Sequence, residues 1–439
     1  MKVAEWGEVP YIFHDKEKLP GFVSYLADIW KNRVLYNEDL QEEVLEEEKQ
    51  ERTIHQQRFF DILFDGRMYA RNYVGVVQYE GIKIEVYPKI FKEDQTLLNK
   101  WHLNLLYWLR YSNKFRFPFS LSGLSTMPFD DLLEFLIYIF ANYTQEILSQ
   151  QPFQAYQAIE EETPFLKGRL LFNDYIRNNI ITGQWQRFTC EHEPFIHDNL
   201  FNRIVKCVTK NLAKISTNET NKRKLDELIF LLDDVSDVSC SAHDCNKIKL
   251  NPLYEEHVNI LSLCKLYLSN QVHDIRDEDN KNFCFLIPME CVFEEFIFGF
   301  IEDKWPSLNA LSQSQQSLTA GKEFWIRNDI YIENQLIIDT KYKIRETGVD
   351  SKAGVIHADL YQMISYAVAR NCHHVLLLYP AITQNSKEGS FQVPSKMLRE
   401  NVNIQVRDIN ITFQELDKAD QLIADRIKEL WPLFRKDCT

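Results

Sequence analysis

The feature that most constrains the fold is a stretch in the last third of the chain that is typical of a β-hairpin. Two runs rich in Ile and Tyr, 326–332 and 335–343, are separated by the polar pair Glu333-Asn334. Short β-branched and aromatic runs joined by a polar break predict two antiparallel strands. Pairing these strands about the break brings Asp329 close to Asp339. The sequence therefore predicts two carboxylates at one place in the fold.

The chemistry of this hairpin depends on which side chains share a face. Successive strand side chains alternate between faces, so Asp339, Lys341 and Lys343 lie on one of them. Carboxylate oxygens suit Mg²⁺, which takes one or two carboxylates together with carbonyl oxygens and waters. Lys341 could orient a water bound to such a cation or stabilise charge on a phosphate. The same residues also fit a surface hairpin with a cross-strand Asp–Lys pair and no chemistry.

Composition sets limits on the class of protein. A chain of 439 residues predicts two or three domains, and 45% hydrophobic content is ample for globular cores. The nine cysteines include no C-x-x-C pair, which is typical of a reducing compartment. The N-terminus has no signal-peptide pattern and no apolar run is long enough to span a bilayer, so we expect a cytoplasmic protein with no membrane partner.

The charge balance constrains any role on DNA. A net charge of −14 is a poor fit to a protein that holds DNA by bulk electrostatics. If DNA is the substrate, contact must rely on local basic patches, metal ions and a partner. The basic cluster Lys167 and Arg169 is one candidate for phosphate contact, although such runs are more often solvated.

Periodicity divides the chain into three expected regions. Alternating strand-like segments predict a β-rich N-terminal domain over 1–120, and long apolar stripes predict a mostly helical middle region over 121–284. The third region, 285–439, reads as an α/β domain. Residues 38–63, which contain an acidic run, are expected to form a solvated helix. The Ser- and Gln-rich segment 311–322 is expected to be a loop.

Within the last region, helices and strands alternate. Residues 286–298 predict a helix with Pro288 in its first turn. The hairpin is followed by a helix near 359–367, buried strands at 374–380 and 404–413, and a final amphipathic helix. The fold class is therefore α/β and α+β multidomain, with a mixed sheet in the C-terminal domain.

The order of polar residues in this region resembles that of the PD-(D/E)xK (restriction-endonuclease-like) nuclease superfamily, in its RecB-like branch. That order is a helix glutamate, a strand aspartate, a D-x-K strand and Gln-x-x-x-Tyr on the next helix. It is found here as Glu294, Asp329, Asp339-Thr340-Lys341, then Gln362 and Tyr366. Asn328 stands where the motif name has Pro, and Asp339 stands in place of Glu. Either carboxylate can ligate a metal.

From about residue 70 onward the chain also resembles the McrC family, the nuclease subunits of McrBC-type modification-dependent restriction systems. The first 65 residues lie outside the resemblance. The segments that carry it are 73–76, 84–90, 167–170, 198–204, Phe293-Glu294 and 327–343.

The resemblance implies a Mg²⁺-dependent DNA endonuclease, with Mn²⁺ able to substitute, whose N-terminal domain docks on a McrB-like hexameric AAA+ GTPase that recognises methylated DNA. This chain has no G-x-x-x-x-G-K-[ST] loop, so nucleotide-driven movement must come from such a partner.

The resemblance also implies roles for individual residues. The metal ligands would be Asp329, Asp339 and the backbone carbonyl of Thr340, with Glu294 completing the site. Lys341 would position or activate water, and Lys343 is a further candidate for DNA contact. The two motif residues on the next helix would orient the catalytic groups or the DNA backbone from a second layer: Gln362 and Tyr366.

Two other functions remain open. One is a non-catalytic activator or scaffold subunit that docks on an AAA+ NTPase, and the other is a stand-alone DNA repair nuclease. The retained Asp329, Asp339 and Lys341 favour catalysis, since a scaffold has no need to keep buried charges face to face. The large N-terminal and middle regions argue against the stand-alone nuclease.

Overall fold

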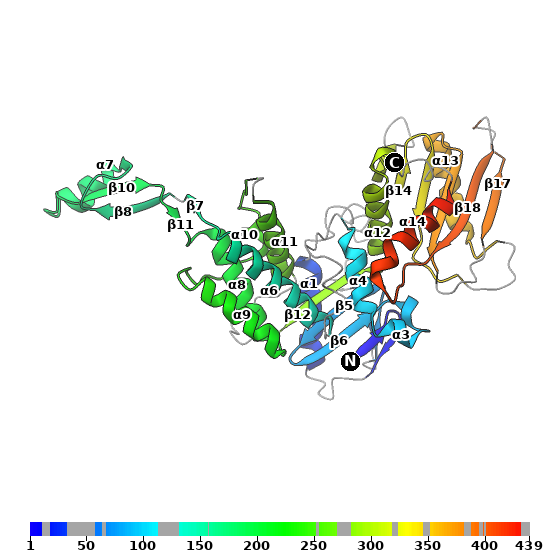
Figure 1. Ribbon diagram of the computed structural model, residues 1–439, viewed down its shortest axis with the longest axis horizontal. Coiled ribbons are helices and arrows are strands. Elements are labelled where there is room, and N and C mark those ends of the chain that lie inside the picture. The colour runs from blue at the N-terminus through cyan, green and yellow to red at the C-terminus, as the bar shows by residue number, and fades with distance from the viewer. Residues whose placement is uncertain are drawn as a thin grey trace. The chain divides into compact units, whose positions relative to one another are not determined.

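The computed structural model divides the chain into two compact units (Figure 1). Unit 1 comprises Met1–Leu132 and Asn282–Thr439, and unit 2 comprises Leu133–Lys281. The expected N-terminal and C-terminal regions therefore share one unit. The residues that the structure describes are 1–10, 18–32, 58–63, 67–112, 131–156, 158–251, 254–269, 282–317, 324–345, 352–381, 388–394, 398 and 401–431.

Most of the acidic helix expected at 38–63 lies outside the described residues; within its last part, β3 (Phe60–Ile62) is a strand. This strand pairs with β4 (Met68–Ala70), which also pairs with β2 (Glu8–Val9), so that three short strands form one sheet. Helix α1 (Lys18–Asn32) buries Phe22, whose ring contacts Phe60.

The larger N-terminal sheet takes one strand from far along the chain. Its order is β1-β6-β5-β12, and β12 (Phe283–Pro288) pairs antiparallel with β5 (Tyr73–Tyr79). The residues expected to begin a helix at 286 are therefore still strand, because 283–288 are apolar at every position and buried on both faces. Pro288 caps the next helix, α12 (Met289–Lys304). The other two strands are β1 (Lys2–Ala4) and β6 (Ile82–Tyr87).

Helix α4 (Trp101–Arg110) is buried almost all round and ties the N-terminal sheet to the C-terminal segment of the chain. The Trp108 indole N–H donates to the backbone oxygen of Ile411 at 2.8 Å. The Asn104 side chain donates to the carbonyl of Phe413 at 3.0 Å and accepts from its N–H at 2.8 Å. Two short helical segments precede α4, namely η1 (Lys89–Phe91) and α3 (Gln95–Leu98).

The C-terminal part of unit 1 is built on a six-stranded mixed sheet, as expected, with strand order β13-β14-β15-β16-β18-β17. The segment expected to be a loop at 311–322 supplies its edge strand, β13. Polar residues suit this position because edge strands are half exposed to water. The strands are β13 (Leu311–Ser317), β14 (Trp325–Ile332), β15 (Leu336–Thr340), β16 (His374–Pro380), β17 (Gly389–Val393) and β18 (Val402–Ile409).

Helix α13 (His357–Arg370) connects β15 to β16, which run parallel. The buried side of α13, which includes Met363 and Ala367, packs against sheet residues such as Ile337 and Val375. The expected helix near 359–367 and strand at 374–380 are thus confirmed. The remaining helical segments of this region are η4 (Pro306–Leu308), η5 (Leu416–Lys418) and α14 (Ala419–Leu430).

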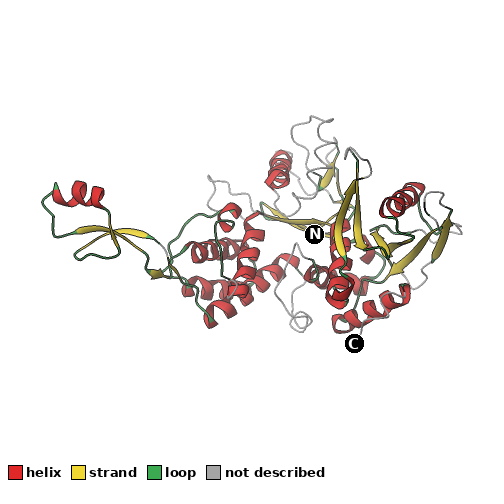
Figure 2. Cartoon of the chain, turned by 90° about the horizontal axis from the view of Figure 1, so that it is seen from above, coloured by secondary structure: helices red, strands yellow, loops and turns green. Residues whose placement is uncertain are grey.

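Unit 2 combines helices with small sheets, so it is less uniformly helical than expected. In Figure 2 its helices gather in one group, and the strands of the three-stranded sheet stand apart from that group. The helices are α6 (Leu132–Gln150), α8 (Leu200–Ile215), α9 (Glu219–Leu231), α10 (Ala242–Cys245) and α11 (Glu255–Ser269).

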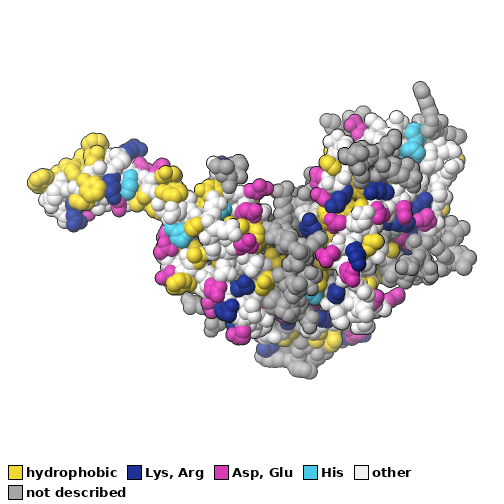
Figure 3. All heavy atoms as spheres, in the orientation of Figure 1, with side chains coloured by type: hydrophobic (Ala, Val, Ile, Leu, Met, Phe, Trp, Pro, Cys, Tyr) yellow, Lys and Arg dark blue, Asp and Glu magenta, His cyan; other side chains and the backbone are white. Residues whose placement is uncertain are grey.

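The sheets of unit 2 carry exposed apolar side chains. The three-stranded sheet has the order β8-β10-β9, and a two-stranded ribbon, β7-β11, joins it to the helices. Figure 3 shows hydrophobic side chains gathered at this end of the unit. The elements are β7 (Ala155–Tyr156), β8 (Ile159–Thr163), β9 (Arg169–Leu170), α7 (Phe172–Asp174), a π-helix (Tyr175–Ile180), β10 (Phe188–His192) and β11 (Phe195–Ile196).

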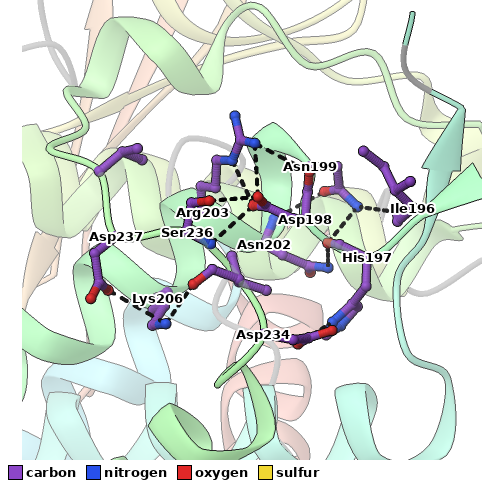
Figure 4. A network of polar contacts seen from close by, with 12 residues as sticks. Ile196, His197, Asp198, Asn199, Asn202, Arg203, Lys206, Asp234, Ser236 and Asp237 are labelled. Atoms are coloured by element: carbon purple, nitrogen blue, oxygen red, sulfur yellow. Dashed lines mark hydrogen bonds and ion pairs between the residues drawn. The ribbon is translucent and has the colours of Figure 1, made fainter. Parts of the chain in front are cut away.

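A polar network fixes the point where the ribbon returns to the helices (Figure 4). The Arg203 guanidinium donates to Asp198 at 2.7 and 3.0 Å, and Ser236 donates to the same carboxylate through its N–H and hydroxyl. Hydrogen bonds from Arg203 and then from Ser236 hold the pKa of Asp198 below its usual range. Asn199 caps α8 by accepting from the N–H of Asn202. The stretch 198–204 therefore builds the start of a helix.

Among the described residues, no helix combines the length and the apolar character needed to cross a membrane.

The contacts of Asn104 generate a stability prediction. Asn104→Leu would leave the N–H and C=O of Phe413 buried without partners, which costs about 2–4 kcal/mol of unfolding free energy. The exposed Asn99→Leu is the control, and we expect a change within about 0.5 kcal/mol. Urea unfolding followed by tryptophan fluorescence measures both. Equal losses in the two variants would contradict the role given to Asn104.

Candidate active site

The hairpin predicted from sequence is present, with a turn one residue longer than expected. Tyr331 pairs with Ile337 and Ile332 with Leu336, so the turn comprises 333–335. Asn334 adopts a left-handed conformation, φ 57°, which Asn tolerates better than most residues. Continuing this register places Asp329 opposite Asp339, on the same face of the sheet.

Asp329 is held by the residue that follows Asp339. Its Oδ2 accepts from the N–H of Thr340 at 2.8 Å and from the Thr340 hydroxyl at 2.9 Å. Burial raises the pKa of Asp329 above its ordinary value, and the Thr340 hydrogen bonds offset part of that shift. The two carboxylates are therefore locked together by the β14–β15 ladder.

Asp339 is the most buried charge of the site, with 1% of the residue exposed. Its Oδ2 lies 2.9 Å from the Lys341 Nζ, while Oδ1 is buried without a hydrogen-bond partner among the described residues. Burial, followed by repulsion from Asp329, raises the pKa of Asp339 to about 8. When both carboxylates are ionised, the single ammonium of Lys341 leaves a net negative charge that a further cation would neutralise.

Lys341 is aimed at the carboxylates by a chain of hydrogen bonds from α13. Its Nζ donates to the Gln362 Oε1 at 3.1 Å, and the Gln362 amide donates to the Tyr366 hydroxyl at 2.6 Å. Burial lowers the pKa of Lys341, but attraction to Asp339 outweighs it and holds the pKa above its ordinary value. The structure thus brings together five of the motif residues: Asp329, Asp339, Lys341, Gln362 and Tyr366.

One buried acidic residue of this cluster was not identified from sequence. Asp359 is nearly fully buried in the first turn of α13, and both of its oxygens lie 3.2 Å from the Lys343 Nζ. Its charge also contributes to the raised pKa values of Asp339 and Lys341. The signal was in the sequence, because positions 359, 362 and 366 follow helical spacing along one face.

Glu294 lies on α12, half-buried, and its contact differs from the expected one. It accepts a hydrogen bond from the Gln313 side chain, which in turn accepts from Arg327, two residues before Asp329. Among the described residues, no group of three or more His, Cys, Asp or Glu side chains is placed to hold a metal ion. Completion of the site by Glu294, directly or through water, therefore stays a prediction.

Lys167 and Arg169 lie in unit 2, around β9. Lys167 pairs with Glu161 at 3.1 Å and Arg169 with Glu191 at 3.6 Å. Gly168 between them has φ +61°, and a Cβ there would lie 2.5 Å from the backbone oxygen of Glu191, so the turn requires glycine. Contact of these two cations with DNA stays a prediction.

The donor set fits a hard divalent cation. Mg²⁺ typically takes one or two carboxylates and keeps several waters, which matches a pair of aspartates. The unpartnered Asp339 Oδ1 gives such a cation a ligand that is buried and already in place. Asp329 and Asp339 are the residues available to hold it, and ligation by the Thr340 carbonyl stays a prediction.

Comparison with known proteins identifies the family. Residues 68–380 match the family model described as McrBC 5-methylcytosine restriction system component. Because that match spans more than half of the chain, the protein belongs to this family. Among curated proteins, no sequence matches the chain.

One solved structure shares the fold, and a second aligns over part of the chain. A chain from the half-complex of the tetradecameric assembly of Thermococcus gammatolerans McrB AAA+ hexamers with bound McrC aligns with a TM-score of 0.67 and 18% identity, covering 98% of this chain and 100% of that one. A chain of the Thermococcus gammatolerans McrBC complex aligns with a TM-score of 0.48 and 20% identity, covering 69% of this chain and 86% of that one. The first alignment supports the architecture described above.

Charge balance at the site predicts a metal-dependent stability. Mg²⁺ at ten times its Kd should stabilise the folded protein by about 1–1.5 kcal/mol, and Asp339→Asn should abolish this gain. Because Asp339, with its pKa about 8, must lose a proton to bind the cation, binding should release protons and tighten as pH rises from about 6 to about 9. Thermal unfolding and calorimetry in two buffers measure these effects.

Without metal, the stability of the folded protein is expected to fall as pH rises. A folded-state pKa raised from 3.8 to about 8 destabilises the folded protein progressively as pH rises between those values, because the unfolded chain has already lost the proton. Asp339→Asn should therefore raise the metal-free Tm at pH 8 by about 2–4 °C. The exposed Asp425→Asn serves as control. A Mg²⁺-induced shift that persists in Asp339→Asn would contradict the site.

Proposed function

We propose that this chain is the Mg²⁺-dependent DNA endonuclease subunit of a McrBC-like restriction system, of the PD-(D/E)xK type, which cuts DNA when coupled to a McrB-like AAA+ GTPase hexamer that recognises methylated DNA. The observation that carries the proposal is the pair of carboxylates, half-buried Asp329 and fully buried Asp339, with Lys341 beside Asp339. Membership of the 5-methylcytosine restriction family supports the restriction setting. The solved relative with McrB hexamers supports the nature of the partner.

Each residue of the site has a role that follows from its contacts. Asp329 and Asp339 would hold the cation, together with the Thr340 carbonyl. The bound cation would neutralise charge on the scissile phosphate and lower the pKa of a coordinated water. Lys341 presents a fixed ammonium beside the carboxylates, suited to orient a nucleophilic water or to stabilise the charge that develops on the phosphate.

The supporting layer keeps that ammonium in place. Gln362 can offer its carbonyl oxygen to Lys341 only while its amide nitrogen faces the Tyr366 hydroxyl, so Tyr366 sets the orientation of Gln362. Asp359 holds Lys343 at the entrance to the cluster, where the half-exposed ammonium can meet a DNA phosphate.

Coupling to a partner requires a docking surface, and unit 2 offers one. Large apolar side chains are exposed together on and around its three-stranded sheet, which is typical of a surface that another protein covers. We assign the AAA+ ring to this surface; docking through 1–120, which the resemblance implies, stays the alternative prediction. The residues of this apolar patch are Phe165, Leu166, Phe172, Ile180, Ile181 and Trp185.

The cleavage test uses the full chain with its partner. We expect little cutting by the protein alone, and double-strand breaks in methylated DNA when the partner GTPase, GTP and Mg²⁺ are added. Asp339→Ala or Lys341→Ala should lower the cleavage rate by at least about 10³-fold, since each removes charge at the reacting phosphate. Agarose gels and initial rates measure the products.

Lys418→Ala is the matched control, because exposed Lys418 pairs with exposed Glu415 in unit 1, and this variant should cut at the wild-type rate. Wild-type cleavage by either site variant would refute the catalytic assignment. Partner GTPase stimulation without any cleavage would identify a scaffold subunit, and efficient cutting without the partner would identify a stand-alone nuclease.

The docking test separates the two candidate surfaces. Trp185→Asp and Ile181→Asp, at positions that are 69% and 74% exposed, place a charge in the apolar patch and should weaken binding of the AAA+ ring by at least about 10-fold. Phe230→Asp, 82% exposed on α9, is the control and should bind normally. Analytical ultracentrifugation with the partner measures affinity. Normal assembly of both patch variants would move docking to another surface, such as the N-terminal region.

A further inference from the structure

Tyr342 follows the site lysine directly and is held by the N-terminal sheet. Its hydroxyl donates to the Glu5 Oε2 at 3.1 Å, and its backbone oxygen accepts from the Lys89 Nζ at 3.2 Å. The same ammonium lies 4.5 Å from the centre of the Tyr342 ring. Both ends of this buried residue are thus fastened by one carboxylate and one ammonium from the other end of the chain.

Glu5 and Lys89 themselves form a rigid pair. The Lys89 Nζ lies 3.1 Å from the Glu5 Oε1, and the N–H of Lys89 donates to the Glu5 Oε2 at 3.3 Å. They follow the paired strands β1 and β6, where the N–H of Glu5 donates to the oxygen of Tyr87 at 2.8 Å. Burial raises the pKa of Glu5, and Lys89 offsets part of that shift.

The backbone around Lys341 is also held by β16 and by the Lys343 N–H, which donates to the Lys341 oxygen at 2.8 Å. Strand β15 ends at Thr340, and the N–H of Lys341 donates to the oxygen of Leu378 at 2.9 Å. The ring of Tyr342 also contacts Phe293. On the N-terminal side, this segment is held by Glu5 and Lys89, and Tyr342 also interacts with the backbone of Ile90.

A buried ion pair is a poor device for stability alone, because desolvation of both charges cancels much of their attraction. It can hold one arrangement of its partners, because charge-assisted hydrogen bonds are shorter and stronger than those between neutral groups. The Glu5 carboxylate and the Lys89 ammonium both form hydrogen bonds with the same residue, Tyr342. This arrangement suggests positioning rather than a general contribution to folding.

We propose that Glu5 and Lys89 are positioning residues for catalysis, which fix Tyr342 and thereby set where the Lys341 ammonium stands relative to Asp329 and Asp339. This inference rests on the proposed nuclease function for its effect on cleavage. It gives the segment 84–90, which carries part of the family resemblance, a role at the active site through Lys89. On this proposal, a shift of strands β1 and β6 would displace Glu5 and Lys89, and through Tyr342 it would change the position of Lys341.

The test uses variants that remove the contacts of Glu5 and Lys89 with Tyr342 in steps. Tyr342→Phe keeps the ring but loses the hydrogen bond to Glu5. The double variant Glu5→Gln/Lys89→Met removes both charges together, so neither is left buried alone. Glu85→Gln is the matched control, because Glu85 is a buried carboxylate of the same sheet whose partners are the Leu132 N–H and Lys2.

The first readout does not need activity. Amide hydrogen exchange of the peptide that contains Lys341 to Lys343 should be at least about 10-fold faster in both test variants and unchanged in Glu85→Gln. The second readout is cleavage with the partner. There kcat should fall by about 10-fold while KM for DNA stays within about twofold, because misplacement of a catalytic group affects the reaction more than binding.

The outcomes separate this proposal from the proposed function. Exchange that matches the control in both test variants overturns the positioning role, as does faster exchange with wild-type kcat. Faster exchange in the variants of a protein that never cuts DNA, even as wild type with its partner, supports the positioning of Lys341 and refutes the nuclease function alone.

Discussion

The interaction on which the site depends is the enforced proximity of Asp329 and Asp339. The β14–β15 register places them on one face, and the Thr340 N–H and hydroxyl hold Asp329 there. Asp339 is almost fully buried, with 1% of the residue exposed. Among the described residues, Lys341 supplies the only opposite charge within hydrogen-bonding distance of it. Such a pair is costly to bury unless something else binds. The fold therefore holds two carboxyl groups whose negative charge is not fully compensated, which is a property expected of a binding or catalytic centre.

The surrounding structure acts to keep the pair and its lysine in one geometry. Helix α13 contributes three polar contacts to the surrounding structure. Asp359 accepts from Lys343 and Gln362 accepts from Lys341. Arg370 donates to Asn328 at 2.8 Å. On the other side, Glu5 and Lys89 hold Tyr342. The helix and the N-terminal strands thus constrain the D-x-K segment from two directions. These contacts add to the β12–β5 pairing and the contacts of α4, which also join the two ends of the chain in one compact unit.

The parts that sequence predicted well are those governed by local pattern. The hairpin, α13 and β16 follow from periodicity, and helical spacing placed Gln362 and Tyr366 on one face. Local pattern does not predict elements that depend on distant pairing. The apolar run of β12 has no period that separates a strand from a helix, and the polar residues of β13 suit a loop as well as an edge strand. Asp359 was missed because a lone helix aspartate is usually solvated, and its burial comes from tertiary packing.

The most direct test of the central claim is anomalous diffraction from crystals of the full chain soaked in Mn²⁺, which has the same preference for oxygen ligands as Mg²⁺. The account predicts an anomalous peak between the carboxylates of Asp329 and Asp339, within about 2.0–2.4 Å of an oxygen from each, and its loss in Asp339→Asn. Absence of the peak at millimolar Mn²⁺ in the wild-type protein, or a peak that survives the substitution, would contradict it.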